Sequence, residues 1–313
     1  MRLAIDHVSI AVPVEKGTKD LLNDVSAVFG PRELVAVMGP SGSGKTTLLN
    51  AIFGGVKPTS GSVTINGQQF DADTAKTFTA LVPQDDMHFV VLTPYETLLD
   101  QTMFKTTLSP SAAKERVEQL LSQFGLQVCK DVRVGDPRLQ QTGLSGGQKK
   151  RLSVAIELVS NPSLLALDEP TSGLDSVSAL VLVKAMKELA QSGATIISTI
   201  HQPSYPIFTT FDSLLLLHAG KTCYVGPVDE REPLAFFAQA GAACPVGHNP
   251  ADFIMDIVSE YTELELAKLH ESATARAEKL LLSVSAKGDE ATVLPVPAPV
   301  RPLRSILLTL MRR

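Results

Sequence analysis

A glycine-rich segment near residue 40 has the residue types that hold phosphate groups. The segment "MGPSGSGKTT" follows the apolar run "ELVAVM" (33 to 38) and leads into the helix-forming "TTLLNAIFG". Small residues leave backbone N–H groups free to surround phosphate oxygens, a lysine adds positive charge, and a hydroxyl can bind a divalent cation. The expected phosphate-binding residues are Gly39, Pro40, Ser41, Gly42, Ser43, Gly44, Lys45, Thr46 and Thr47. Strand, glycine loop and helix in this order predict a site for a nucleoside triphosphate with Mg2+.

A second apolar run ends in two carboxylates. "SLLALDEP" (163 to 170) is typical of a buried strand, and it stops at Asp168 and Glu169. Ligands of open parallel sheets lie at the carboxyl ends of the strands, so both side chains are expected beside the phosphates. We expect Asp168, with Thr46, to hold Mg2+. Glu169 is expected to orient and deprotonate the attacking water.

Two further strands end in polar residues. Gln84 follows "TALV", and its amide can bind both Mg2+ and water, so we count it with Thr46 and Asp168 as a metal ligand. His201 follows "ATIISTI" and is expected to donate a hydrogen bond to the γ-phosphate. A histidine after a strand is more often an ordinary satisfied polar group. The predicted catalytic set is therefore Glu169, His201 and Gln84.

The chain carries a second loop of the anion-binding type. "TGLSGGQKKRLSVA" (142 to 155) places Ser145, Gly146, Gly147 and Gln148 at the start of a predicted helix. One nucleotide has one γ-phosphate, which the first loop already covers from one side. If the second loop lies on a separate helical arm, it can cap only a nucleotide held by another subunit. We therefore expect a head-to-tail pair with two identical composite sites.

These motifs resemble those of a known family. "GPSGSGKTT", "PQDD", "LSGGQ", "LALDEP", "SGLDS" and "IHQPS", in this order, are similar to the nucleotide-binding domain of ATP-binding cassette (ABC) proteins over about residues 1 to 230. The resemblance implies an ATPase that uses ATP and Mg2+, with Ser145 and Gly147 on the opposing γ-phosphate. It also implies that Asp175 lies in a loop coupling two sites, and that His201 acts as a γ-phosphate switch.

The organisation of the chain follows from pattern and resemblance together. Residues 1–30 and 61–70 alternate like exposed antiparallel strands, and Thr93 with Glu96 forms a predicted capping box. We expect an α/β fold: a P-loop NTPase (RecA-like) core with a mainly parallel sheet, an N-terminal antiparallel β-subdomain and an inserted α-helical subdomain. The expected ranges are 1–266 for the ATPase domain (core 1–86 and 162–266, helical subdomain 87–161), and 267–300 for a linker.

The segment after residue 200 resembles one subfamily more narrowly. "HQPSYPIFTTFDSLLLLHAGKTCYVGP" and "CPVGHNPADFIMDIVS" are similar to the white, or G, subfamily, in which the ATPase domain precedes a membrane domain on one chain. The resemblance implies a second nucleotide-binding domain and the transmembrane domain of a half-transporter as partners. It also implies a membrane location with the ATPase domain on the cytoplasmic face, and a lipid-like or hydrophobic substrate. Residues 12–26 lack the aromatic that many cassettes stack on adenine.

Composition and the C-terminal residues complete the expectations. The net charge of -5 disfavours nucleic acid as a partner, and Cys129, Cys223 and Cys244 have no zinc-binding spacing. No apolar run is long enough to span a bilayer. Residues 301–313 combine arginines with apolar residues at helical spacing, so we expect a basic amphipathic segment leading toward a membrane domain absent from this chain. The rival function is a soluble, non-transport ABC ATPase acting as a nucleotide-switched interaction protein.

Overall fold

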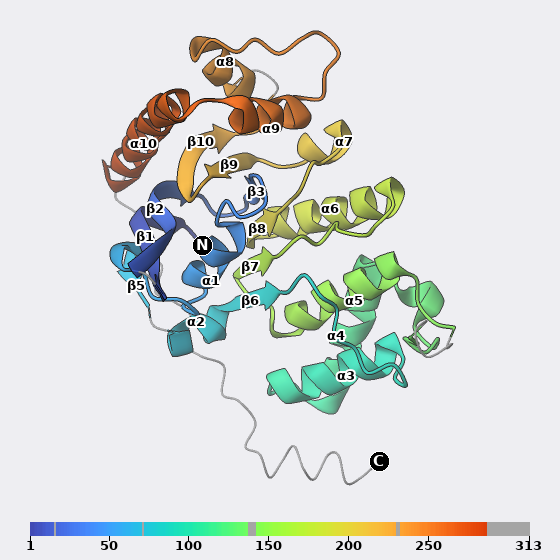
Figure 1. Ribbon diagram of the computed structural model, residues 1–313. Helices are drawn as coiled ribbons and strands as arrows, with labels where there is room; N and C mark the ends of the chain where they lie inside the picture. Colours follow the sequence, from blue (N-terminus) through green and yellow to red (C-terminus); the bar gives the residue numbers. More distant parts are fainter. Residues whose placement is uncertain (16, 71, 137–141, 230–231, 287–313) are drawn as a thin grey trace.

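A six-stranded, mainly parallel sheet forms the centre of the molecule (Figure 1). The computed structural model describes residues 1–15, 17–70, 72–136, 142–229 and 232–286. The strand order is β10-β9-β3-β8-β7-β6, and every neighbouring pair is parallel except β9 and β10. The strands are β3 (Leu34–Met38), β6 (Thr79–Val82), β7 (Leu164–Leu167), β8 (Thr195–Thr199), β9 (Ser213–His218) and β10 (Lys221–Pro227). The predicted α/β fold class is confirmed.

Both faces of this sheet are covered, which explains why its strands are continuously apolar. Along β3, Leu34 and Met38 pack into one hydrophobic cluster, whereas Val35 and Val37 pack into another on the opposite face. Helix α6 (Ser176–Gln191) contributes to the first cluster. Helix α1 (Lys45–Ile52) contributes to the second. A strand buried on both sides has no polar alternation, as the run "LVAVM" predicts.

A second, antiparallel sheet covers α1. Its order is β2-β1-β4-β5, formed by β1 (Leu3–Val14), β2 (Gly17–Phe29), β4 (Ser60–Ile65) and β5 (Gln68–Gln69). Its apolar side chains, such as Ile5 and Val25, join Leu48 and Ile52 of α1 in one cluster. Helix α2 (Ala72–Phe78) then leads into β6. The antiparallel strands predicted for residues 1–30 and 61–70 are therefore confirmed.

In the described part of the chain between β6 and β7, three α-helices form a helical arm, defined here as residues 94–136 and 142–160, on one side of Figure 1. They are α3 (Pro94–Lys105), α4 (Pro110–Gln123) and α5 (Gly146–Glu157), with short 3-10 turns at Gln127–Cys129 and Leu158–Ser160. At the start of α3, Thr93 Oγ1 accepts from Glu96 N over 3.2 Å and Thr93 N donates to Glu96 Oε2 over 3.0 Å. This is the predicted capping box.

The segment after β8 completes the edge of the sheet. Helix α7 (Tyr205–Phe208) precedes β9, and a tight turn at Ala219 and Gly220 joins β9 to β10. Helices α8 (Glu232–Gln239) and α9 (Pro250–Glu260) follow. Asn249 caps α9 by accepting from Ala251 N over 3.2 Å, with Pro250 in the first turn, as the sequence predicts.

The linker predicted for residues 267–300 is wrong over its first part. Residues Glu263–Ala286 form helix α10, which packs against β2 and β10. Leu269, Ala273 and Ala277 recur every four residues and are buried at that contact. Polar groups add to this apolar stripe: Arg276 lies over the ring of Tyr224 in β10 and pairs with Glu232, and His270 Nδ1 lies 3.0 Å from Thr222 O of β10. Residues 287–300 lie outside the described part of the chain, as does the basic segment 301–313.

Within the described ranges, no helix combines the length and the apolar character that crossing a bilayer requires.

Candidate functional site

The glycine loop between β3 and α1 is shaped for close approach. A Cβ on Gly39 would lie 2.1 Å from Leu217 O and 2.5 Å from Ser43 Oγ, so only glycine fits there. The loop is also fixed to the β9–β10 turn, because Gly220 N donates to Ser43 O over 3.1 Å. Among the described residues, Ser43 Oγ is buried and has no hydrogen-bond partner. An unpaired hydroxyl inside a glycine cradle fits a site for an anionic ligand.

The ammonium group of Lys45 lies over this loop. It donates to the carbonyl oxygens of Gly39 over 2.8 Å and Pro40 over 3.1 Å. Burial lowers the pKa of Lys45, and the carboxylates of Glu169 and Asp168 oppose that shift. The charge is therefore held in a desolvated position beside the loop, where phosphate oxygens would be better partners than neutral carbonyls.

A cavity of about 560 Å³ opens beside the loop. Its lining comprises Lys19, Asp20, Leu21, Ser41, Gly42, Gly44, Lys45, Thr46, Thr47, Glu169 and Ala219. Most of the predicted phosphate residues, from Ser41 to Thr47 except Ser43, therefore share one cavity with the predicted base Glu169, whereas Gly39 and Pro40 do not line it. The contributions of β2 and of the β9–β10 turn were not predicted, because they depend on how the antiparallel sheet sits against the core.

The carboxylate Asp168 joins two other elements. Thr46 Oγ1 of α1 donates to Asp168 Oδ2 over 3.0 Å, and Thr199 Oγ1 of β8 donates to Asp168 Oδ1 over 2.7 Å. Thr199 Oγ1 also accepts from Glu169 N over 2.7 Å. The hydroxyl of Thr46 and the carboxylate of Asp168 are hard oxygen donors of the kind that Mg2+ prefers. Thr199 was missed, although it is a polar residue at the end of an apolar strand.

The two predicted groups for water activation touch each other. Gln84 Nε2 donates to Glu169 Oε2 over 2.9 Å. Glu169 has φ of 45°, a left-handed conformation that a glutamate rarely adopts. Such strain persists where the surroundings fix the residue, and it is common at functional sites. The structure thus brings Gln84, Asp168, Glu169 and Thr46 together at the carboxyl edge of the sheet.

His201 is placed differently. It is exposed and lies two residues beyond the end of β8, next to Gln202, which has φ of 44°. Its side chain does not line the cavity beside the glycine loop. The γ-phosphate contact expected of His201 therefore stays a prediction.

The second loop lies at the start of α5 on the helical arm. Ser145 caps the helix, because its Oγ accepts from Gln148 N over 3.3 Å while its own N–H donates to Gln148 Oε1 over 2.8 Å. Gly147 packs tightly against α6, where a Cβ would lie 3.0 Å from Ser178. Ser145 and Gly146 are exposed. None of the residues 144–148 lines the cavity of its own chain.

Asp175 caps the neighbouring helix α6. Its carboxylate accepts from Val177 N over 3.1 Å and Ser178 N over 2.9 Å. The hydrogen bonds from Ser178 are the main reason that the pKa of Asp175 lies below its usual value. The caps of α5 and α6 therefore lie on adjacent, packed helices.

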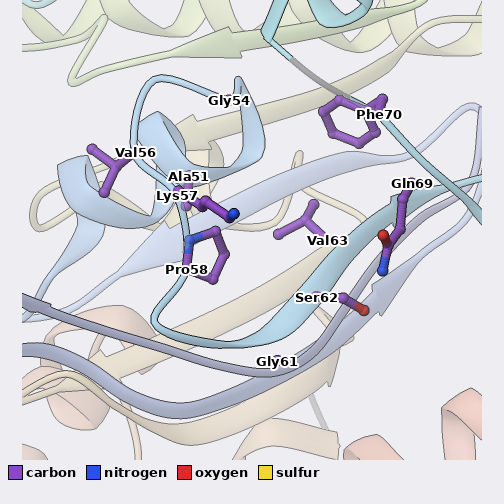
Figure 2. A pocket seen from close by; sticks show the side chains of 10 residues that line it. All are labelled: Ala51, Gly54, Val56, Lys57, Pro58, Gly61, Ser62, Val63, Gln69 and Phe70. Carbon is purple, nitrogen blue, oxygen red and sulfur yellow. The ribbon is translucent and has the colours of Figure 1, made fainter.

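A separate cavity of about 400 Å³ lies at the other end of α1 (Figure 2). Lys57, Pro58 and Val63 point into it, and Gln69 and Phe70 close one side. It contains none of the predicted site residues, so the candidate site is the cavity beside the glycine loop.

Comparisons with known proteins agree with this geometry. A family model described as ABC transporter matches residues 22–172, and one described as ABC-2 type transporter matches residues 201–281. A solved dimer of the ATP-binding cassette MJ0796, in a post-hydrolysis state bound to ADP and Pi, superposes with a TM-score of 0.62 and 25% identity. The match covers 72% of this chain and 99% of that chain.

Curated relatives are more similar in sequence. ABC transporter G family member 5 of Oryza sativa subsp. japonica is 41% identical over 80% of this chain and 32% of its own length. G family member 13 of Arabidopsis thaliana is 40% identical over 87% of this chain and 40% of its own length. Protein white of Drosophila melanogaster is 42% identical over 77% of this chain and 36% of its own length. The chain thus spans well under half of the length of these relatives. It belongs to the ATP-binding cassette transporter family, in the G or white subfamily, and carries the ATPase domain of that family.

Proposed function

We propose that this chain binds ATP with Mg2+ and hydrolyses it, and thereby powers transport by an ABC transporter of the G subfamily. The observation that carries the proposal is the convergence of the glycine loop, Asp168, Glu169 and Gln84 on one edge of the sheet. The proposed ATPase domain comprises the core, the helical arm and helix α10, and so extends beyond residue 266.

The loop residues fit a triphosphate. Backbone N–H groups of residues 39–47 would surround the β- and γ-phosphates, and Lys45 would exchange its two carbonyl partners for phosphate oxygens. Thr46, Asp168 and Gln84 would hold Mg2+, which supplies positive charge to the phosphate oxygens as they become more negative. The described lining of the cavity contains no aromatic side chain that could stack on adenine, and Leu21 offers an apolar contact there.

Glu169 is the proposed general base. Its carboxylate accepts a proton from the attacking water as the water oxygen forms a bond to the γ-phosphorus. The bond from that phosphorus to the bridging oxygen breaks, and its electrons leave with ADP. Gln84, hydrogen bonded to Glu169, orients the water, and His201 would donate to a γ-phosphate oxygen after a local movement toward the cavity.

The exposed cap of α5 supports a site shared by two subunits. Ser145, Gly146, Gly147 and Gln148 would bind the γ-phosphate held by a partner nucleotide-binding domain, and Asp175 would lie between the two sites. Ser145 caps its own helix and does not line its own chain's cavity, which favours this assignment. The proposed partner is a second nucleotide-binding domain, in a homodimer or a heterodimer.

Exposed apolar residues in the segment that joins β6 to the helical arm suit contact with a membrane domain. Met87, Phe89 and Val91 are 88%, 69% and 61% exposed. Two backbone hydrogen bonds, from Val134 N to Leu92 O and from Gly135 N to Val90 O, place residues 134 and 135 beside this segment. Apolar side chains gathered on one face are typical of a protein interface. We propose that the transmembrane domain of a half-transporter contacts this surface from the cytoplasmic side of a membrane, and that the substrate is lipid-like or hydrophobic.

Phosphate release by the purified chain tests the ATPase proposal. We expect release that requires Mg2+, stops with EDTA and rises more than linearly with protein concentration, because each site needs two subunits. No release above the Glu169→Gln variant would contradict the proposal. Fractionation of native cells tests the transport proposal: the gene product is expected in the membrane pellet, with a mass above 33.4 kDa. A soluble product of that mass would favour the nucleotide-switched interaction protein.

A further inference from the structure

Lys150 of α5 is a buried cation that contacts a distant segment of the chain. The residue is only 4% exposed. Its Nζ donates to the main-chain carbonyl of Gln84 over 2.7 Å and forms an ion pair with Asp86 Oδ1 at 2.8 Å. A buried ammonium group is very costly unless it is paired and hydrogen bonded. The segment around Gln84 therefore cannot separate from α5 without exposing or stranding this charge.

A second group of hydrogen bonds, one turn further along α5, strengthens the contact. Ser153 Oγ donates to Asp86 Oδ1 over 2.6 Å. Because its hydrogen is used there, Ser153 Oγ accepts from His88 Nε2 over 3.0 Å, and Lys149 O lies 3.1 Å from the same nitrogen. His88 thus carries its proton on Nε2, and burial lowers its pKa and favours this neutral form. Both ends of the segment 84–88 are fixed to one face of α5.

Lys150 lies between two functional groups. The side chain of Gln84 contacts Glu169, while its carbonyl is held by Lys150. Ser145, which caps α5, precedes Lys150 by little more than one helical turn. A continuous helix transmits a displacement along this distance with little bending, so a shift of Gln84 carries the α5 cap with it.

We propose that Lys150 is a positioning residue that holds Gln84 in register with α5, so that the γ-phosphate contact of one site and the Ser145 cap serving the other site move together. This inference rests on the proposed function. It assigns to Lys150 no contact with ATP, which distinguishes it from Lys45.

Lys150→Met tests the inference, because methionine keeps the length and apolar character of the side chain and removes the charge. We expect kcat for ATP to fall by about tenfold or more, the Hill coefficient to fall toward one, and the dissociation constant of a fluorescent ATP analogue to change less than twofold. Lys150→Arg restores most of the activity, since arginine can donate to both the carbonyl and the carboxylate.

Lys105→Met is the matched control. Lys105 also pairs a helix of the arm with α5, through Glu157 at 2.9 Å, but it lies at the far end of α5 from Gln84. The kcat of the Lys105→Met variant is expected to lie within about threefold of the kcat of the unsubstituted chain. Equal effects of Lys150→Met and Lys105→Met on kcat and on the Hill coefficient would overturn the inference.

A double variant covers the case in which Lys150→Met fails to fold. Lys150→Met with Asp86→Leu removes both charges, so no unpaired ion is left buried. Its kcat is also expected to fall about tenfold or more, because the Gln84 carbonyl loses its donor. Turnover at the unsubstituted rate would reject the positioning role. Inactivity of the unsubstituted chain is a different outcome: it would reject the proposed function, and with it the inference.

Discussion

The hydroxyl of Thr46 donates a hydrogen bond to Asp168 Oδ2 over 3.0 Å, across 122 residues of sequence. This contact joins the helix after the glycine loop to the end of β7. Two oxygen groups that already meet at hydrogen-bond distance are suited to share one Mg2+. In the proposed function, their contact would set the position of the metal and the γ-phosphate relative to Glu169.

Asp168→Asn is expected to weaken the metal site. The amide keeps the shape of the side chain but loses the negative charge, so the Mg2+ concentration that supports half-maximal hydrolysis should rise by about tenfold or more. Titration of ATPase activity with Mg2+ measures this. Asp73→Asn, at an exposed ion pair with Lys76 on α2, is the control and should leave the titration unchanged.

Glu169→Gln is expected to separate binding from hydrolysis. Glutamine can still accept the hydrogen bond from Gln84 but cannot take a proton, so turnover should fall by about 100-fold or more while ATP affinity is preserved. Single-turnover hydrolysis and nucleotide binding are the two measurements. Glu188→Gln, on the exposed side of α6, is the control. If the Glu169 variant turned over at the unsubstituted rate, another group would have to be the base.

Leu269→Ala tests whether α10 is part of the folded domain. Leu269 is 2% exposed and belongs to the hydrophobic cluster that holds Tyr224 of β10 and Phe237 of α8, so its truncation should lower the free energy of unfolding by about 2 to 5 kcal/mol. Leu264→Ala removes the same atoms from a 67% exposed position of the same helix and should change the free energy of unfolding by less than about 0.5 kcal/mol. Equal effects in denaturant unfolding would mean that α10 does not dock in solution.

His7 should make stability depend on pH. Its Nδ1 lies 2.5 Å from Asp24 Oδ1, and this hydrogen bond is the main reason that the pKa of His7 is raised. Asp6, Glu278 and His270 surround the pair. A raised pKa means that the stabilisation is complete below the unfolded value of 6.5 and is lost as the pH rises through the folded value.

The melting temperature is the measurement. Between about pH 6 and pH 8.5, the unsubstituted chain should lose about 1 to 3 °C relative to His7→Asn, a small effect because both side chains are more than a third exposed. Asparagine suits the left-handed φ of 49° at this position. If the melting temperatures of the two proteins changed with pH in parallel, His7 would be excluded as the titrating group.

Much of the core could be predicted from sequence because its signals are local. The apolar runs of β3 and β7, the glycine loop and the Thr93 capping box each depend on neighbouring residues. The packing of helix α10 could not be predicted, because its buried residues Leu269 and Ala277 join hydrophobic clusters formed by segments far away in the sequence. The proline-rich residues that follow it favoured a linker over the whole segment.

The candidate site also contains residues that the sequence predicted and residues that it did not. Asp168, Glu169 and Gln84 follow strands, and the rule that strand ends share one sheet edge predicted their meeting. Thr199 and Lys150 were missed because their roles depend on partners that only the fold brings near: Asp168 for the hydroxyl, and the carbonyl of Gln84 for the ammonium group. A carbonyl acceptor leaves no signal in the identity of the residue that carries it.

The central claim is that one chain supplies the glycine loop and another supplies Ser145. Complementation tests it most directly: Lys45→Ala and Ser145→Arg chains, each inactive alone, are mixed and assayed for ATP hydrolysis. A mixed head-to-tail pair keeps one intact site, formed by Lys45 of one chain and Ser145 of the other, so activity should return. When both substitutions are on the same chain, its pair with an unsubstituted chain has both sites damaged, so adding that double variant should not raise hydrolysis above the activity of the unsubstituted homodimers. If the two single variants remained inactive together under conditions in which the unsubstituted chain dimerises and hydrolyses ATP, the shared site would be contradicted.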